Sequence, residues 1–285
     1  MTEWRCTAGE FPHATTVAQM ASKGLQLYEN LQAYYPARAR LMMHEKNLPY
    51  ESIQLDLFKG GALTPQFLKL NPAGTVPVLV TDGMVITQSL DIVKYLDTLG
   101  SRLGESIAPE TVAPWVDLIE KWNGNDYMAA TGGESFRALF KMIADYNTSI
   151  CNARMKTFPD MAQVYKDKLA SITAPKDEAR IQATQEQLKV ILEKAESQLA
   201  ASKFIAGSEY TIADVLLTVA LYRVGASGQF SKVTASSPNV VAYYTRMQER
   251  PSFNDTYKAT CSQRFPIFGV LPGLLRIAFF KLTGC

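Results

Sequence analysis

Residues 71–79, which read Asn-Pro-Ala-Gly-Thr-Val-Pro-Val-Leu, and the pair Gln88-Ser89 are suited to hold a small peptide. Pro77 cannot donate to a strand ladder, so its junction with Val76 is expected to be a bend or an exposed edge. If this bond is cis, the backbone N–H and C=O of Val76 turn outward and can pair with an extended ligand as another strand would. Ser89 opens a segment of helical apolar period, and a hydroxyl beside free N–H groups at a helix start favours a carboxylate. These residues predict a site for an acidic peptide with an extended backbone.

Two short runs rich in β-branched residues, 76–81 and 84–87, are predicted to form a hairpin beside this site. Asp82-Gly83 between them supplies the positive φ angles of a type I′ turn. Residues 25–97 alternate strand and helix patterns in the order β-α-β-α-β-β-α, which indicates an α/β domain with helices over a mixed sheet. The peptide site is therefore expected on a small α/β domain.

The second half of the chain has a helical pattern. Trp115, Ile119 and Trp122 share one predicted helix face, and Leu188, Ile191, Leu192, Ala195 and Leu199 share another. The predicted organisation is a mobile N-terminal arm at residues 1–24, an α/β domain at 25–99, a Gly/Ser/Pro-rich linker at 100–109, a helical domain at 110–255 and an apolar C-terminal extension at 256–285.

The pattern N-P-x-G-x-V-P-x-L followed by Gln-Ser resembles glutathione transferases, and the resemblance extends over nearly the whole chain. Residues 25–28 look like the first strand of that family and residues 36–41 like the start of its first helix. Residues 204–214 are similar to its capping motif, in which Thr211 caps a helix and the Asp214 side chain accepts from the backbone N–H of Thr211.

Residues 140–199 look most like the tetrachlorohydroquinone-dehalogenase-like class of plant glutathione transferases. The resemblance implies an α/β plus all-α architecture, with an N-terminal thioredoxin-like, glutathione-binding domain followed by a C-terminal helical bundle. It also implies glutathione as co-substrate, a homodimer, and a cytoplasmic role in detoxification.

The chain departs from the family where the thiol of glutathione would be activated. The family lowers the pKa of this thiol with a hydroxyl or a cysteine between the first strand and the first helix, aided by the helix N-terminus. The resemblance places Ala33 there, which can do neither, so a mixed-disulfide reaction is disfavoured. Tyr34 and Tyr35 are the predicted catalytic hydroxyl donors, and Tyr28 is the next candidate. The alternative is that the Tyr34 and Tyr35 rings only wall the pocket.

The resemblance also assigns the residues that would contact glutathione. Ala62 and Leu63 stand where a plant class usually has polar or basic residues for the glycine carboxylate. Lys59 is the candidate substitute, although a loop lysine is commonly only solvated. Gln88 and Ser89 could likewise simply cap a helix. The predicted glutathione-binding residues are Lys59, Thr75, Val76, Pro77, Gln88 and Ser89.

Aromatic and Met side chains near the start of the helical domain suit an apolar, adaptable substrate pocket. Trp115, Trp122 and Met128 are the predicted electrophile pocket, and the alternative for each is plain core. The prediction is an enzyme that transfers the thiol of glutathione to a hydrophobic electrophile, with halogenated compounds among the candidates. The runner-up is a non-catalytic scaffold or ligand carrier of the same fold at a membrane surface.

Composition argues against other functions. The net charge of +2 and the lack of a basic stripe with interleaved aromatics argue against nucleic acid as a partner. The four cysteines fall at no metal or redox spacing, and with two histidines a metal centre is not expected.

The C-terminal extension has two interpretations. Residues 267–282 are strongly apolar, but Pro272 and Gly273 interrupt them and they are too short for a membrane span of about 20 residues. From Pro272 onward, apolar residues share one helical face and Arg276 and Lys281 lie elsewhere, which suits an interfacial helix. The same residues could instead pack on the helical bundle. The sequence therefore leaves two locations for the protein, the cytoplasm and a membrane surface.

Overall fold

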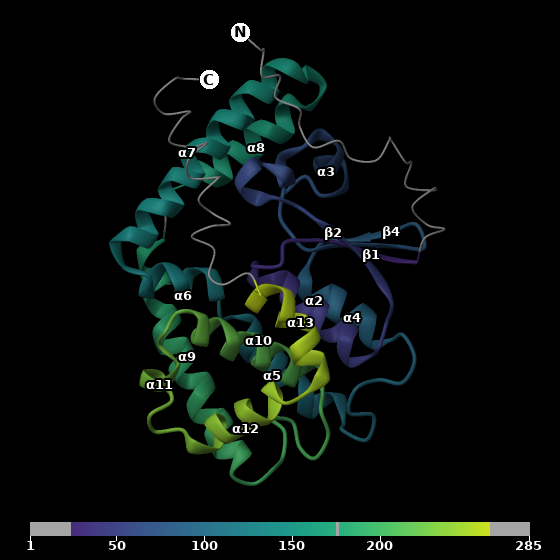
Figure 1. Cartoon of the computed structure of the whole chain (residues 1–285), viewed down its shortest axis with the longest axis vertical. Coiled ribbons are helices and arrows are strands. Elements are labelled where there is room, and N and C mark those ends of the chain that lie inside the picture. Colours follow the sequence, from purple (N-terminus) through teal and green to yellow (C-terminus); the bar gives the residue numbers. More distant parts are fainter. Residues whose placement is uncertain (1–23, 175–176, 263–285) are drawn as a thin grey trace.

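The computed structural model describes residues 24–174 and 177–262 (Figure 1). The predictions for the N-terminal arm before residue 24 and for the extension from residue 263 onward lie outside the described residues. No helix among the described residues is long and apolar enough to cross a membrane.

The N-terminal domain is built on a mixed sheet in the order β2-β1-β3-β4. β1 pairs in parallel with β2 and antiparallel with β3, and β3 pairs antiparallel with β4. The predicted α/β domain with a mixed sheet is therefore confirmed. The strands are β1 (Leu25–Glu29), β2 (Tyr50–Gln54), β3 (Val78–Thr81) and β4 (Met84–Ile86).

The β3–β4 hairpin turns at Asp82 and Gly83, whose φ angles are 43° and 77°. Two consecutive positive φ angles are the mark of the predicted type I′ turn. The first strand is shorter than predicted, because it begins at Val78 and leaves Val76 and Pro77 in a bend before it. Pro77 has no N–H for the ladder, and its peptide bond with Val76 is cis.

The two faces of the sheet are covered by different helices. Leu27 and Leu79 pack in the main core with α2 (Tyr34–Glu45) and α4 (Ser89–Asp97). The opposite face, which carries Tyr28, Val78 and Val80, packs on α3 (Pro65–Leu70) and on the short segment before it. That segment consists of the 3-10 turns η2 (Leu57–Lys59) and η3 (Gly61–Leu63).

The helical domain is organised around α10 (Ile212–Ala226), which is buried along most of its length. Its N-terminus has the predicted capping box, in which Thr211 and Asp214 satisfy each other's backbone N–H groups. The other helices are α5 (Pro109–Glu120), α6 (Gly124–Thr131), α7 (Gly133–Thr157), η4 (Pro159–Met161), α8 (Ala162–Thr173), α9 (Glu178–Leu199), α11 (Phe230–Val233), α12 (Pro238–Gln248) and α13 (Pro251–Ser262).

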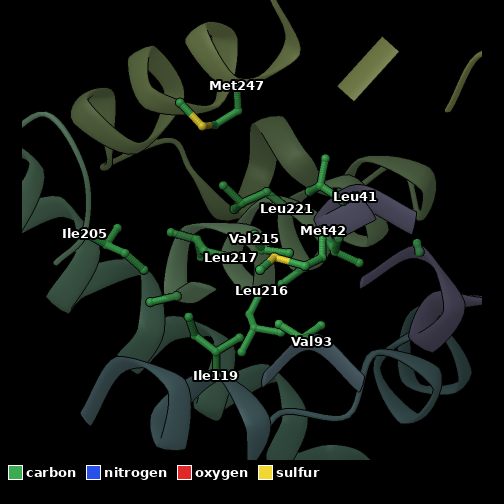
Figure 2. Close-up of a cluster of buried hydrophobic side chains, with 14 of the residues drawn as sticks. Leu41, Met42, Val93, Ile119, Ile205, Val215, Leu216, Leu217, Leu221 and Met247 are labelled. Atoms are coloured by element: carbon green, nitrogen blue, oxygen red, sulfur yellow. The ribbon is translucent and has the colours of Figure 1, made fainter. Parts of the chain in front are cut away.

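A single buried apolar cluster joins the two domains. Figure 2 shows Leu41 and Met42 of α2 and Val93 of α4 against Ile119 of α5 and Leu216 of α10. The last helix, α13, also packs on α2. It runs through the predicted boundary at residue 255, so the start of the predicted extension belongs to the helical domain.

A second contact between the domains is made by α7 and α8, which form a helical hairpin beside α3 (Figure 1). A small apolar cluster of Leu63, Leu68, Cys151, Met161 and Tyr165 lies between them. The Tyr165 hydroxyl donates to the Leu63 carbonyl at 3.0 Å. The domains therefore meet on both faces of the sheet.

Candidate functional site

Ser89 is the first residue of α4, as the sequence predicted, and Gln88 is the N-cap. The Ser89 side chain is buried, and its Oγ lies 3.4 Å from Nη1 of Arg38, which donates to it. Gln88 is exposed and its side chain makes no capping bond. Because the Ser89 oxygen accepts from Arg38, its own proton remains available for an anionic ligand at the helix N-terminus.

Arg38 connects both N-terminal helices to the helical domain. The side chain is fully buried; Nη1 forms an ion pair with Glu120 of α5, and Nη2 donates to the Tyr34 hydroxyl at 3.1 Å. Burial alone would lower the pKa of Arg38, but Tyr34 and Glu120 beside it turn the net shift upward. The guanidinium therefore stays charged close to Ser89.

Ala33 is the N-cap of α2 and, having no polar side chain, provides no capping bond. Tyr34 beside it is buried, with its ring 5.7 Å from that of Trp122 in an edge-on contact. Tyr35 is partly exposed, and burial raises the pKa of its hydroxyl to about 12. Tyr35 therefore stays protonated at neutral pH and can serve as a hydrogen-bond donor there.

Arg223 of α10 lies over the same group of rings. Its Cζ is 5.3 Å from the centroid of Tyr34, and burial lowers the pKa of its guanidinium. No carboxylate of the described residues lies within 4.0 Å of Arg223. A cation without an anionic partner among the described residues thus stands near the N-terminus of α2, and both features favour an anion there.

The segment before β3 is held in place by Asn71. The Asn71 side-chain amide donates to the carbonyl of Thr75 at 2.8 Å and to its Oγ1 at 3.1 Å. Thr75 is exposed, Val76 is partly buried and Pro77 is buried. Val76 lies outside the β3 ladder, so its backbone groups are not used in pairing with β4.

Lys59 lies in the η2 turn with 55% of its side chain exposed, and its Nζ is 3.0 Å from Oδ2 of Asp56. Asp56 also caps this turn by accepting from the N–H groups of Phe58 and Lys59. The structure therefore pairs Lys59 with an aspartate of its own turn.

The predicted electrophile residues have different surroundings. Trp122 is fully buried, and its indole N–H donates to the Thr184 carbonyl at 3.1 Å. Met128 is nearly buried on α6. Trp115 instead lines a surface hollow of about 460 Å³ together with Glu193, Lys194, Ser197 and Gln198 of α9. The structure brings Trp122 to Tyr34 but places Trp115 against α9.

In the part of the chain that the structure describes, no group of three His, Cys, Asp or Glu side chains is placed to hold a metal ion.

Sequence reasoning did not single out Arg38, Glu120 or Arg223. A signal existed for Arg38, which follows Tyr34 by four residues and so shares its helix face. Arg223 is the one basic residue of the largely apolar helix 212–226, which marks it as unusual. Glu120 had no signal, because no local pattern predicts a partner 82 residues away.

Two family models match the chain. Residues 34–99 match the glutathione S-transferase N-terminal domain, and residues 157–251 match the glutathione S-transferase C-terminal domain. Together they cover more than half of the 285 residues. Residues 100–156, which include most of α5–α7, lie between the two matches.

Relatives over most of the chain include glutathione S-transferase TCHQD of Arabidopsis thaliana, 25% identical over 80% of this chain and 88% of the relative. The tetrachloro-p-hydroquinone reductive dehalogenase of Sphingobium chlorophenolicum is 26% identical over 80% of this chain and 94% of the relative. Among solved structures, a beta-etherase from Sphingobium sp. strain SYK-6 has a TM-score of 0.62 at 19% identity, covering 82% of this chain and 99% of the other. Glutathione transferase F2 of Populus trichocarpa has a TM-score of 0.56 at 21% identity, covering 84% and 99%.

Proposed function

Because the chain belongs to the glutathione S-transferase family, we propose that it binds glutathione and transfers its thiol to a hydrophobic electrophile. The dehalogenase among its relatives makes halogenated aromatic compounds the first electrophiles to test.

The observation that supports this proposal best is the pairing of Ser89 with Arg38 at the start of α4. A buried hydroxyl, a buried guanidinium and a helix N-terminus together favour a carboxylate. Nε of Arg38 is a buried donor without a hydrogen-bond partner among the described residues. In the proposed complex the γ-glutamyl carboxylate binds here, and the backbone of Val76 pairs with the cysteinyl residue as a strand would.

The proposal keeps the other predicted glutathione contacts, which the structure supports to different degrees. Thr75 and Pro77 flank Val76, and Gln88 is exposed at the helix start beside Ser89. Lys59 would have to leave Asp56 to reach glutathione, so it is the weakest of the predicted contacts.

The binding step is tested by calorimetric titration of glutathione into the wild-type chain and Ser89→Ala. Loss of a charge-assisted hydrogen bond of about 1.5–3 kcal/mol should lower the affinity about ten- to a hundredfold. Ser208→Ala, at an exposed serine of the helical domain, is the matched control and should change nothing. Equal affinity of folded Ser89→Ala and wild-type protein would remove Ser89 from the site.

For thiol activation we propose Tyr35 ahead of Tyr34. Tyr35 is protonated at neutral pH and partly exposed, whereas Tyr34 is buried in the interior, where its hydroxyl accepts from Arg38. Tyr35→Phe should raise the apparent pKa of the thiol in the pH-rate profile and leave glutathione affinity largely intact. If Tyr35→Phe, Tyr34→Phe and the double variant all keep wild-type turnover, the donor lies elsewhere and Tyr28 is the next residue to change.

The electrophile is proposed to meet the thiol near the N-terminus of α2, with Met128 in its wall. Trp122 would hold the Tyr34 ring in place through their edge-on contact. Trp115 would contact the substrate only if the substrate extends toward α9.

A carrier without catalysis is the second candidate, and Ala33 favours it because no hydroxyl or thiol stands at the N-cap of α2. Glutathione titration followed by a conjugation assay with an aromatic halide separates the two functions. Binding with turnover supports the enzyme, binding alone supports the carrier, and neither supports a scaffold.

We propose a cytoplasmic homodimer, which light scattering coupled to gel filtration can test. For residues 266–285 the membrane-surface alternative is tested by sedimentation with anionic vesicles at low salt, where electrostatic attraction is strongest. A full-length chain that does not sediment would exclude that alternative.

A further inference from the structure

Lys168 of α8 reaches across to the thioredoxin-like domain. Its Nζ donates to the carbonyls of Ala73 at 2.6 Å and Gly74 at 3.2 Å, immediately before Thr75 and Val76. A Cβ placed on Gly74 would lie 3.2 Å from Cε of Lys168 and 3.1 Å from the Ala62 carbonyl. The lysine side chain therefore lies close to Ala62 and contacts the turn at residues 73–74, which leads to the proposed peptide-binding strand.

Lys168 is a partly buried cation with only neutral partners. No carboxylate of the described chain lies within ion-pair distance of its Nζ. Burial lowers the pKa of its ammonium, and Cys151 nearby opposes this shift in part. An ammonium has three N–H donors, and the two carbonyls take two of them. Charge and one donor remain for an anion.

The position of Lys168 complements that of Ser89. Ser89 belongs to the helices on the Leu27 and Leu79 face of the sheet, whereas Lys168 lies against the segment on the Tyr28 and Val78 face. Val76 precedes β3 at the end of the sheet between these faces. A ligand paired with Val76 would therefore have the helix of Ser89 on one side of the sheet and the hairpin of Lys168 on the other.

Resting on the proposed function, we propose that Lys168 binds the second carboxylate of glutathione, that of its glycine. The helical hairpin α7–α8 would then supply a cation that residues 62 and 63 of the N-terminal domain, an alanine and a leucine, lack. Glutathione would be held by both domains, and its γ-glutamyl and glycine ends would be recognised by Ser89 and Lys168, respectively.

The competing explanation is that Lys168 only ties α8 to the turn at residues 73–74. A purely structural contact would contribute to folding and would have the same effect on the affinity for every form of the peptide. A carboxylate site would instead favour the peptide whose glycine end is charged. Glutathione and its glycine ethyl ester differ in that charge and share the γ-glutamyl group and the thiol.

The experiment is calorimetric titration of both peptides into the wild-type chain, Lys168→Met and Lys168→Arg. We expect the wild-type chain to bind glutathione about ten- to a hundredfold more tightly than the ester, the range of one charge-assisted hydrogen bond. Lys168→Met should bring the two affinities to about the same value by weakening only the binding of glutathione. Lys168→Arg, which keeps the positive charge, should keep part of the preference for glutathione. Lys166→Met, at an exposed lysine of the same helix, should keep the wild-type ratio.

Each outcome separates this proposal from the function on which it rests. Binding of glutathione and the ester with equal affinity by the wild-type chain overturns the role of Lys168 and leaves the proposed function standing. A ratio unchanged in folded Lys168→Met does the same. If the wild-type chain binds neither peptide, the proposed function fails and this proposal fails with it. Should Lys168→Met not fold, the wild-type ratio and Lys168→Arg still decide.

Discussion

The two contacts between the domains use buried charge in opposite ways. On the α2–α4 face, a broad apolar core surrounds Arg38, whose guanidinium has Glu120, Tyr34 and Ser89 as partners. On the α3 face, Lys168 lies beside a small apolar cluster that includes Cys151, and its hydrogen-bond partners are two carbonyls. A paired cation stabilises a fixed arrangement, whereas a cation without a carboxylate retains its attraction for a ligand. The first contact is therefore expected to hold the fold while it presents Ser89 to the ligand, and the second to be more weakly held and to offer Lys168 to the other end of the ligand.

The largest expected effect comes from opening a cavity in each contact. Leu216→Ala in α10 should lower the free energy of unfolding by an amount near the upper end of about 2–5 kcal/mol, because the surrounding core is extensive and cannot collapse. Leu68→Ala in α3 should fall near the lower end, because its smaller cluster can relax. Urea denaturation of both variants measures the difference. Equal losses would mean that the two contacts are equally rigid.

The second prediction concerns pH and the N-terminus of α10, the helix that carries the first contact. Burial raises the pKa of Asp214 to about 6, against 3.8 for the ordinary side chain, although Thr211, Ile205 and Tyr243 donate to it. Between these values the folded state binds more protons than the unfolded state, so this group makes stability fall as the pH rises from about 4 to about 6.

The test compares unfolding free energies of the wild-type chain and Asp214→Asn across this range. The advantage of the wild-type chain should narrow with rising pH, by about 3 kcal/mol at most. Other titrating groups are common to both proteins and cancel. A constant difference would show that Asp214 has the same pKa in the folded and unfolded states.

A third prediction removes the anionic partner of Arg38. Glu120→Gln leaves a buried guanidinium without its carboxylate and should lower the free energy of unfolding by about 1–3 kcal/mol. The loss is limited because the Glu120 side chain is 36% exposed and water can take its place. Asp117→Asn removes an exposed carboxylate from the same helix and should have little effect. Similar small losses of unfolding free energy in Glu120→Gln and Asp117→Asn would mean that the ion pair of Arg38 does not stabilise the first contact.

The smallest effect is expected from Tyr165→Phe, which deletes the hydrogen bond from α8 to the Leu63 carbonyl. A loss of about 0.5–1.5 kcal/mol should appear in denaturation curves. Hydrogen exchange should show faster opening of α7 and α8, with α10 unchanged, if the second contact opens on its own. Equal acceleration in α10 would mean that both contacts open together.

Features that depend on neighbours in the sequence were predicted well. Asp82-Gly83 specifies its turn through the φ angles that these residues tolerate, and Thr211 with Asp214 specifies a helix start through hydrogen bonds three residues apart. Ser89 was correctly placed at the first turn of its helix for the same reason.

What the sequence did not reveal depends on which surfaces meet. Helical spacing put Trp115 and Trp122 on one face, but only the packing of α9 and α2 decides that one faces a hollow and the other is buried beside Tyr34. Lys168 meets Ala73 across 95 residues, and its helix is joined to the site by no local pattern.

The docking of α13 on α2 has a consequence for the order in which this chain can fold during synthesis. Glu45 near the end of α2 accepts from Arg250, 205 residues later, and Ser252 of α13 donates to the same carboxylate. At about 5–20 residues per second, roughly 10–40 s of translation separate these groups. During that interval the apolar side of α2 that α13 covers stays open to solvent. A ribosome-bound chain ending before residue 251 is therefore a natural client for chaperones that bind exposed apolar surface.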